Sequence, residues 1–247
     1  MLPPLSPVSP RAHVSPYDAS SFIIHPSSLI FLIMPSKKSP WIDVTIPFAN
    51  GMHTWPGNPP TVIKPHAALA KGDVCNVSVF NLNTHAGTHM DSPWHFLKGL
   101  GTMDDLPFEA VIGPCRVVEI KDKESVKPTE LAKLKLKKGE RILFRTRNSR
   151  VSWQKKSFDK DFVYVSQEAA RYLVDKGIRT VGIDYFSVGG FTKDSVPTHH
   201  ILLGKKVWII EGLNLAKAKP GRYEMICLPI RIAKGDGAPC RCILRPL

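Results

Sequence analysis

Hydrophobic and polar residues alternate along several short stretches of the chain, a pattern typical of half-buried β-strands. Other stretches are apolar throughout and short, as in buried strands. Together these patterns predict strands at residues 41–46, 62–68, 74–83, 115–120, 142–144, 180–184 and 207–210. Glycine and proline residues predict a loop over residues 47–60.

Two stretches predict helices. Residues 166–177 give the clearer one, because Ser166 is a natural N-cap and Gly177 a natural C-terminal stop. A second helix is predicted over residues 128–134, and residues 102–106 resemble a helix start followed by a turn. A glycine- and proline-containing loop is predicted before His199. The 247 residues, 43% of them hydrophobic, suffice for one large domain or two small ones.

Residues 1–38 differ in composition from the rest of the chain. They are rich in proline and serine, and their apolar run at residues 29–34 is too short to span a bilayer. We expect a disordered extension, or a start assigned too far upstream with Met34 as the first residue, followed by the folded domain at residues 39–247. A transit peptide is the alternative, since the segment carries Arg11, several serines and one acid, although its prolines oppose an amphipathic helix.

The segment from His85 to His95 reads His-Ala-Gly-Thr-His-Met-Asp-Ser-Pro-Trp-His and holds three of the nine histidines. Clustered imidazole and carboxylate groups are typical of metal or catalytic sites, whereas a lone histidine is more often an ordinary polar residue. Gly87 and Pro93 oppose a regular helix, so a tight loop or a distorted strand end is predicted. There, Gly87 would let the backbone approach a ligand closely, and Thr88 would orient its neighbours.

The pattern His-x-Gly-Thr-His-x-Asp-x-Pro-x-His, unbroken from His85 to His95, resembles the signature of the cyclase-like metal-dependent hydrolases, which include bacterial kynurenine formamidase and isatin hydrolase. The resemblance extends over about residues 41–246. Its further motifs are Trp55-Pro56-Gly57, Gly182-Ile183-Asp184, His199-His200-Ile201-Leu202-Leu203, Glu211-Gly212-Leu213, Leu228-Pro229-Ile230 and Gly237-Ala238-Pro239-Cys240-Arg241. It implies an α+β fold, a single swivelling β/β/α-type domain with barrel-like mixed sheets flanked by helices.

The same resemblance implies the roles of individual residues. It implies a metal site whose ligands are His85, His89, Asp91, His199 and Glu211. Nitrogen and oxygen ligands of this kind suit Zn or Mn, as one or two divalent ions that lower the pKa of a water molecule and so produce a hydroxide nucleophile. His95 is implied as the general acid/base and Trp55 as a wall of the substrate pocket, with His200 in a supporting place beside His199. Asp184, at the end of a short strand, is also expected to support the site.

We therefore expect an enzyme that hydrolyses a small amide, acting on C–N bonds other than peptide bonds. An arylformamide such as N-formyl-kynurenine is the leading substrate. The alternatives are an isatin-like cyclic amide hydrolase and a non-enzymatic protein that binds metal or nucleic acid. We further expect a small-molecule partner, a homodimer or higher homo-oligomer, and neither a membrane nor a nucleic-acid partner.

Charge and cysteine content bear on these alternatives. Residues 116–160 hold fifteen Lys or Arg against six Asp or Glu, and so supply +9 of the chain's formal net charge of +13. Such a patch can bind nucleic acid, but no recognition motif or regular aromatic spacing accompanies it, which favours solvated helix and loop surface. The five cysteines are scattered and odd in number, which predicts reduced thiols in a cytoplasmic protein.

Overall fold

A computed structural model describes residues 40–247, so the prediction of a disordered extension over residues 1–38 falls outside the described residues. The strands of the described range are β1 (Ile42–Asp43), β2 (Val62–Ala67), β3 (Val77–Asn81), β4 (His89–Asp91), β5 (Ile112–Glu119), β6 (Ser125–Val126), β7 (Arg141–Arg145), β8 (Tyr164–Val165), β9 (Thr180–Ile183), β10 (Trp208–Glu211), β11 (Gly221–Pro229) and β12 (Gly237–Pro246). The α-helices are α1 (Phe108–Val111), α2 (Pro128–Leu131), α3 (Gln167–Asp175) and α4 (Ser195–Gly204).

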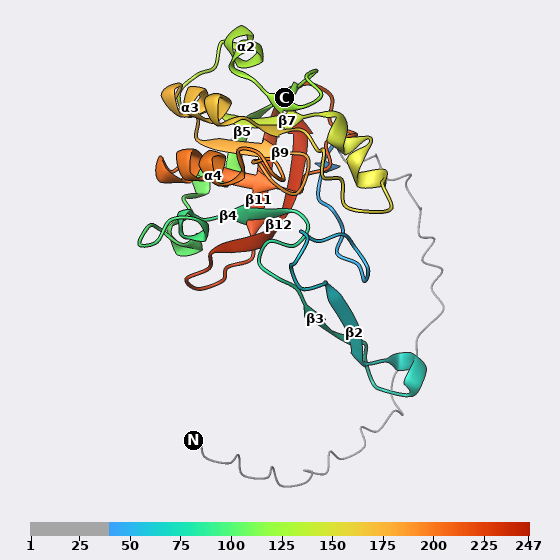
Figure 1. The fold of residues 1–247 in the computed structure, drawn as a ribbon. Coiled ribbons are helices and arrows are strands. Elements are labelled where there is room, and N and C mark those ends of the chain that lie inside the picture. The colour runs from blue at the N-terminus through green and yellow to red at the C-terminus, as the bar shows by residue number, and fades with distance from the viewer. Residues whose placement is uncertain (1–39) are drawn as a thin grey trace, which may run out of the picture. The chain divides into compact units, whose positions relative to one another are not determined.

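Within residues 40–247, seven strands close into a barrel-like sheet (Figure 1). They neighbour one another in the order β12, β11, β5, β7, β9, β10 and β4, and β4 pairs again with β12 to close the circle. The strands from β5 through β7 and β9 to β10 are parallel, and the remaining pairs are antiparallel. The expected fold, a swivelling β/β/α-type α+β domain with a barrel-like mixed sheet flanked by helices, is confirmed.

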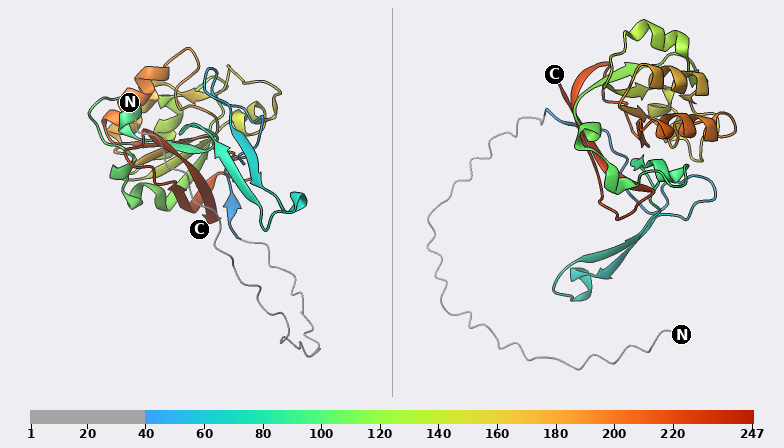
Figure 2. Two further views of the ribbon diagram at one scale, coloured as in Figure 1. Left: turned by 90° about the horizontal axis from the view of Figure 1, so that it is seen from below. Right: turned by 90° about the vertical axis from the view of Figure 1, so that its left-hand side faces the viewer.

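Side chains along the central strands alternate between two apolar cores. In β7, Leu143 belongs to the core inside the barrel, whereas Ile142 and Phe144 belong to the core between sheet and helices. Helices α2, α3 and α4 lie on the same side of the sheet (Figures 1 and 2), and they complete the second core with Leu131, Leu173 and Leu202. Burial on both faces explains why these strands are apolar throughout instead of alternating.

Most predicted elements have a counterpart in the structure. The strands predicted after residue 60 correspond to β2, β3, β5, β7, β9 and β10. The first predicted strand, residues 41–46, is shorter, since only Ile42–Asp43 is a strand and Thr45 adds an isolated bridge to Leu213. The predicted helices are α3 and α2, and α2 continues as a 3-10 turn over Ala132–Leu134.

The sequence patterns did not predict helix α1 or strands β6 and β8, and they also missed two larger features. The first is helix α4, which begins at Ser195 where a loop up to His199 was expected. Pro197 is tolerated in α4 because it lies in the first turn. The second is the long antiparallel pair β11 and β12, which closes the barrel. Among residues 40–247, no helix has the length and apolar character that a bilayer span requires.

Gly212 is the residue after β10, and it packs against the turn that precedes β4. Its φ is +70°, and a Cβ at this position would overlap the carbonyl oxygen of Gly87. Thr88 ties the same segments together, because its hydroxyl donates to the Gly212 carbonyl oxygen at 2.6 Å and accepts from the Ile46 amide at 2.8 Å. A side chain at position 212 would therefore push apart the two segments that hold the barrel closed.

We expect Gly212→Ala to lower the free energy of unfolding by about 1–3 kcal/mol more than Gly99→Ala, because of the added backbone contact. Gly99 is a matched control, since its φ is +80° but its Cβ direction is open. Chemical denaturation of the two variants provides the measurement. Equal losses would show that backbone conformation alone is responsible.

Candidate metal centre

Strand β4 carries two of the predicted ligands on one face. His89 and Asp91 are two residues apart, so their side chains point the same way, while Met90 between them belongs to the core inside the barrel. β4 pairs with β10, which places His89 opposite Glu211. The register of the sheet therefore brings His89, Asp91 and Glu211 together on the face opposite the barrel core.

Helix α4 contributes His199 to the same cluster. Its Nε2 lies 3.2 Å from Glu211 Oε1 and 3.7 Å from Asp91 Oδ2. Its Nδ1 lies 2.6 Å from the carbonyl oxygen of Ser195, one turn earlier, so Nδ1 is the natural donor and Nε2 is left for the cluster. His200 is exposed on the helix, and its ring meets Phe96 edge to face, while Phe96 stacks on His199.

The turn before β4 orients His89. The carbonyl oxygen of Gly87 lies 3.0 Å from His89 Nδ1, which leaves His89 Nε2 facing Asp91 Oδ1 at 3.5 Å and Glu211 Oε2 at 3.3 Å. Gly87 has a φ of +57°, and a Cβ there would press on Phe48. The backbone at Gly87 thus lies close to other parts of the chain. Thr88 orients its neighbours through its hydroxyl group, as predicted.

His85 lies between two carboxylates. Its Nδ1 is 2.9 Å from Asp91 Oδ1, and its Nε2 is 3.1 Å from Asp236 Oδ2. Burial disfavours the protonated imidazole, but the hydrogen bonds to Asp236 and Asp91 outweigh burial and raise the pKa of His85 to about 10. The hydrogen bond from His85 in turn lowers the pKa of Asp236 to about 2.

Asp236 is a site residue that the sequence interpretation missed. The Thr84 hydroxyl donates to Asp236 Oδ1 at 3.1 Å, so the carboxylate that faces His85 Nε2 is itself held in place. Carboxylates that accept the second N–H of a ligating histidine commonly fix its ring and raise its basicity. The signal in the sequence is an acid between Gly235 and Gly237, one residue before the last motif of the resemblance.

The cluster fits a divalent metal. Three ligand atoms from His85, His89 and Asp91 lie within 4.8 Å of one another, and so do three from Asp91, His199 and Glu211. His89 Nε2 and Asp91 Oδ2 are buried without a hydrogen-bond partner, which is costly unless another group satisfies them. Asp91 belongs to both groups, and the two oxygens of Glu211 face different histidines. The donors would therefore suit one or two divalent ions.

His95 stands beside this cluster at the end of the 3-10 turn Pro93–His95. Its ring stacks on His85, with centroids 3.8 Å apart and planes inclined by 24°. Burial lowers the pKa of His95, and the imidazoles of His85 and His199 act in the same direction, against the nearby carboxylates. A neutral imidazole near neutral pH can accept or donate a proton, which suits acid/base chemistry.

The cluster opens into a cavity of about 470 Å³. Aromatic side chains of Trp55, Phe96 and Phe186 form part of its wall, together with His95. Trp55 is held by edge and tilted contacts with Phe158 and Phe191, each with ring centroids 5.4 Å away. The structure thus places Trp55, the predicted pocket wall, at the cavity that contains the histidines.

Asp184 anchors the neighbouring loops. It is buried at the end of β9 and accepts hydrogen bonds from the amide and hydroxyl groups of Thr146 and Ser149. Its burial raises the pKa of the Asp184 carboxyl, against these hydrogen bonds. Thr146 and Ser149 do not line the cavity, so the supporting role expected of Asp184 at the site stays a prediction.

The family described as "Putative cyclase" matches residues 42–189 of the chain. The chain belongs to this cyclase family. The match covers the motif from His85 to His95, whereas His199, Glu211 and Asp236 follow it.

Curated relatives and solved structures agree with this membership. The kynurenine formamidase of Bacillus cytotoxicus is 33% identical over 211 residues, which are 85% of this chain and 100% of that protein. A solved predicted metal-dependent hydrolase from Bacillus stearothermophilus is 32% identical, with a TM-score of 0.72 over 83% of this chain and 97% of its own. Isatin hydrolase A from Labrenzia aggregata, 20% identical with a TM-score of 0.73 over 83% of this chain and 92% of its own, shares the fold.

We expect Asp236→Ala to weaken divalent-metal binding about 10- to 100-fold, because His85 would lose the acceptor that orients its ring. Asp236→Asn should lose less, since the amide oxygen can still accept. The exposed Asp175 provides a charge-matched control, Asp175→Ala. Competition with a chromophoric chelator measures the affinity without any assay of activity. Wild-type affinity in Asp236→Ala would contradict the role given to Asp236.

Proposed function

We propose that this protein is a metal-dependent amidohydrolase that cleaves the C–N bond of a small aromatic amide. An arylformamide such as N-formyl-kynurenine is the leading substrate. The observation that carries this proposal is a buried cluster of three imidazoles and two carboxylates that opens into an aromatic-walled cavity. Kynurenine formamidases that match 85% of the chain over their whole length support it.

The proposed ligands are the five residues expected from the sequence, His85, His89, Asp91, His199 and Glu211. We propose that they hold one or two divalent ions, Zn or Mn, because these ions accept mixed nitrogen and oxygen ligands. Such an ion, when bound, acts as a Lewis acid that polarises a carbonyl group and activates water. The chain's own part is to orient the imidazoles, through the acceptors at Gly87, Ser195 and Asp236.

His95 is proposed as the general acid/base. Because His95 stacks on His85 and lines the cavity, its ring lies next to the metal cluster without being one of the five proposed ligands. An amide nitrogen leaves readily only when it is protonated, so a histidine at this place can donate the proton that the leaving amine needs. Trp55 is proposed to bind the aromatic part of the substrate by stacking area.

We further propose that residues 39–247 form the hydrolase domain, that the protein assembles as a homodimer or higher homo-oligomer, and that it works in the cytoplasm. The five cysteines of the described residues are free thiols, four of them buried, and free thiols are typical of a reducing location. Several cations of residues 116–160 are committed to ion pairs within the chain, such as Arg116 with Glu140 and Arg145 with Glu119. These pairs support the interpretation of this segment as ordinary surface.

We expect His95→Ala to lower kcat on the order of 10²-fold or more while metal content stays at the wild-type level, because a proton-transfer group is lost and no ligand is. Steady-state kinetics on formanilide and metal analysis of the same sample give both values. The exposed His66 supplies the control, His66→Ala. Loss of metal from His95→Ala would instead make His95 a ligand.

We expect Trp55→Ala to raise KM for an aryl formamide with a smaller effect on kcat, since stacking area is lost while the metal ligands remain. Trp55→Phe should keep most of the affinity. The substrates to compare are N-formyl-kynurenine, formanilide and isatin. A preference for isatin would favour the cyclic-amide alternative, and no hydrolysis of any of them by metal-loaded protein would refute the proposed function.

A further inference from the structure

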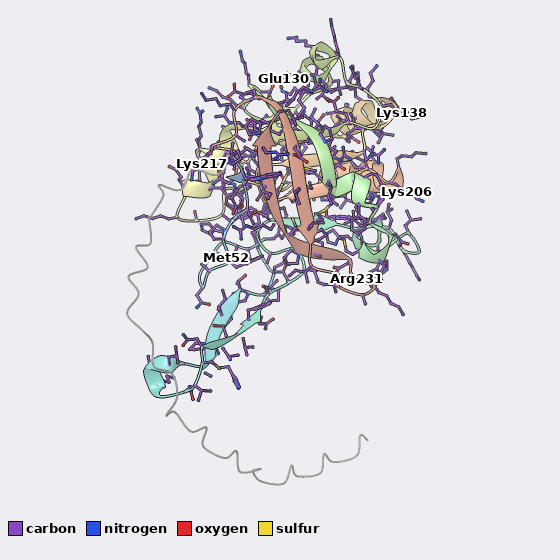
Figure 3. The ribbon with its side chains drawn as sticks, turned by 180° about the vertical axis from the view of Figure 1, so that it is seen from behind. Met52, Glu130, Lys138, Lys206, Lys217 and Arg231 are labelled. Carbon is purple, nitrogen blue, oxygen red and sulfur yellow. The ribbon has the colours of Figure 1, made fainter. Side chains whose placement is uncertain are left out.

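A second cavity, of about 490 Å³, lies apart from the metal centre. The described residues that form its wall are all different from those that line the metal cavity. The wall comes from the turn that carries His95, the loop before α1, the residue before β9, and the stretch from the end of α4 to the start of β10. In Figure 3, Lys206 is labelled near the green helix α1, and the residue before that helix, Pro107, belongs to the same wall.

Part of this wall is apolar. Trp208, the first residue of β10, lines the cavity and is only 5% exposed, so the remainder of its surface is fixed by packing in the barrel core. Pro93, Pro107 and Leu100 add aliphatic surface. A cavity of this size with an aromatic side chain and a few polar groups has the character of a small-molecule site, for which volumes of about 300–1,000 Å³ are usual.

Two cations, Arg179 and Lys206, line the same cavity. Neither forms an ion pair with an acid of residues 40–247, whereas Arg116 and Arg145 are each paired with a glutamate. Burial lowers the pKa of the Arg141 guanidinium, and the positive charge of Arg179 acts in the same direction, so Arg179 adds to positive charge that is already present. Uncompensated positive charge at a half-buried position favours the binding of an anion.

The backbone at Lys206 is unusual for a lysine. Lys206 follows the end of α4 and has a φ of +57°, in the left-handed region where glycine is the favoured residue after a helix. The ammonium group is therefore held beside the cavity by a residue that the backbone does not favour.

The wall contains one carboxylate, that of Asp105. Its Oδ2 accepts from the Thr102 amide at 2.8 Å, as part of the capping box of the 3-10 turn Met103–Asp105, so this group already has a partner within the chain. Two cations and one carboxylate leave the wall with a formal charge of +1. This charge matches a monoanion better than a dianion.

We propose that this cavity binds a small aromatic monocarboxylate. The carboxylate would contact Arg179 and Lys206, because guanidinium and ammonium groups both donate charge-assisted hydrogen bonds to carboxylates. The ring would pack on Trp208, whose indole offers a rigid aromatic surface. The site is separate from the metal centre, and the inference does not depend on the proposed hydrolysis or on its substrate.

The test is a titration of the full-length, metal-loaded protein with para-fluorobenzoate, followed by fluorine NMR. We expect saturable binding that the double variant Arg179→Gln/Lys206→Gly weakens at least about 10-fold, because charge-assisted hydrogen bonds are lost. Glycine at position 206 suits the local φ, and Lys135→Gly is the matched control, since Lys135 is exposed, has a φ of +49° and lies outside the cavity. Metal content reports whether each variant keeps the folded cluster.

Two further ligands separate charge from shape. We expect para-fluorobenzyl alcohol, which lacks the charge, to bind at least about 10-fold more weakly than para-fluorobenzoate, and para-fluorophenyl phosphate to bind no more tightly. Absence of binding at millimolar concentration would overturn the proposal. Carboxylate binding that the double variant leaves unchanged would place the anion at the metal centre and would also overturn it. Equal affinity for the alcohol, or tighter binding of the phosphate, would refute the assigned class of ligand.

Discussion

Strand β4 is only three residues long, yet it pairs with β10 on one side and β12 on the other, and the rest of the structure depends on this double pairing. It closes the barrel, and successive side chains along it point to opposite faces, where they have different functions. Met90 fills the barrel core, while His89 and Asp91 face the cavity side. Because a strand held from both edges cannot rotate, the ligand geometry is fixed by the same hydrogen bonds that hold the fold.

The second constraint is electrostatic. Asp91 and Glu211 are buried carboxylates within the same cluster, and burial of two like charges is costly without compensation. Burial opposes their ionisation, but the neighbouring histidines lower the pKa of both carboxyls. Positive charge is therefore required at this place, and a divalent cation can supply it instead of protons on the imidazoles. Metal and protons thus compete for the same site.

Local sequence patterns predicted the parts of this structure that depend on neighbours along the chain. The cluster from His85 to His95 stands out by composition, and helix α3 by its N-cap Ser166, whose hydroxyl accepts from the Ala169 amide at 3.2 Å. Asp236 could not be recognised in this way. It is an acid in a loop, and its importance comes from His85, a residue 151 positions away in the sequence.

The same limit applies to the fold. Alternation along residues 62–68 and 74–83 predicts two strands, but the same period would serve a strand of the barrel, so nothing local indicates that β2 and β3 pair only with each other. Helix α4 was missed because Pro197 and two adjacent histidines obscure its start, and its apolar residues are not confined to one face. The function of this helix becomes clear only from the contact of His199 with Glu211.

The two faces of β4 have different functions, and this difference has an evolutionary consequence. Substitutions inside the barrel alter stability without touching the cavity, while the aromatic wall comes from other segments, with Trp55, Phe96 and Phe186 all outside the barrel strands. Such segments tolerate insertion and replacement far better than strands do. A lineage can therefore exchange one substrate for another by changing these segments, while the ligands stay in place. Substitutions in the barrel core can accumulate independently.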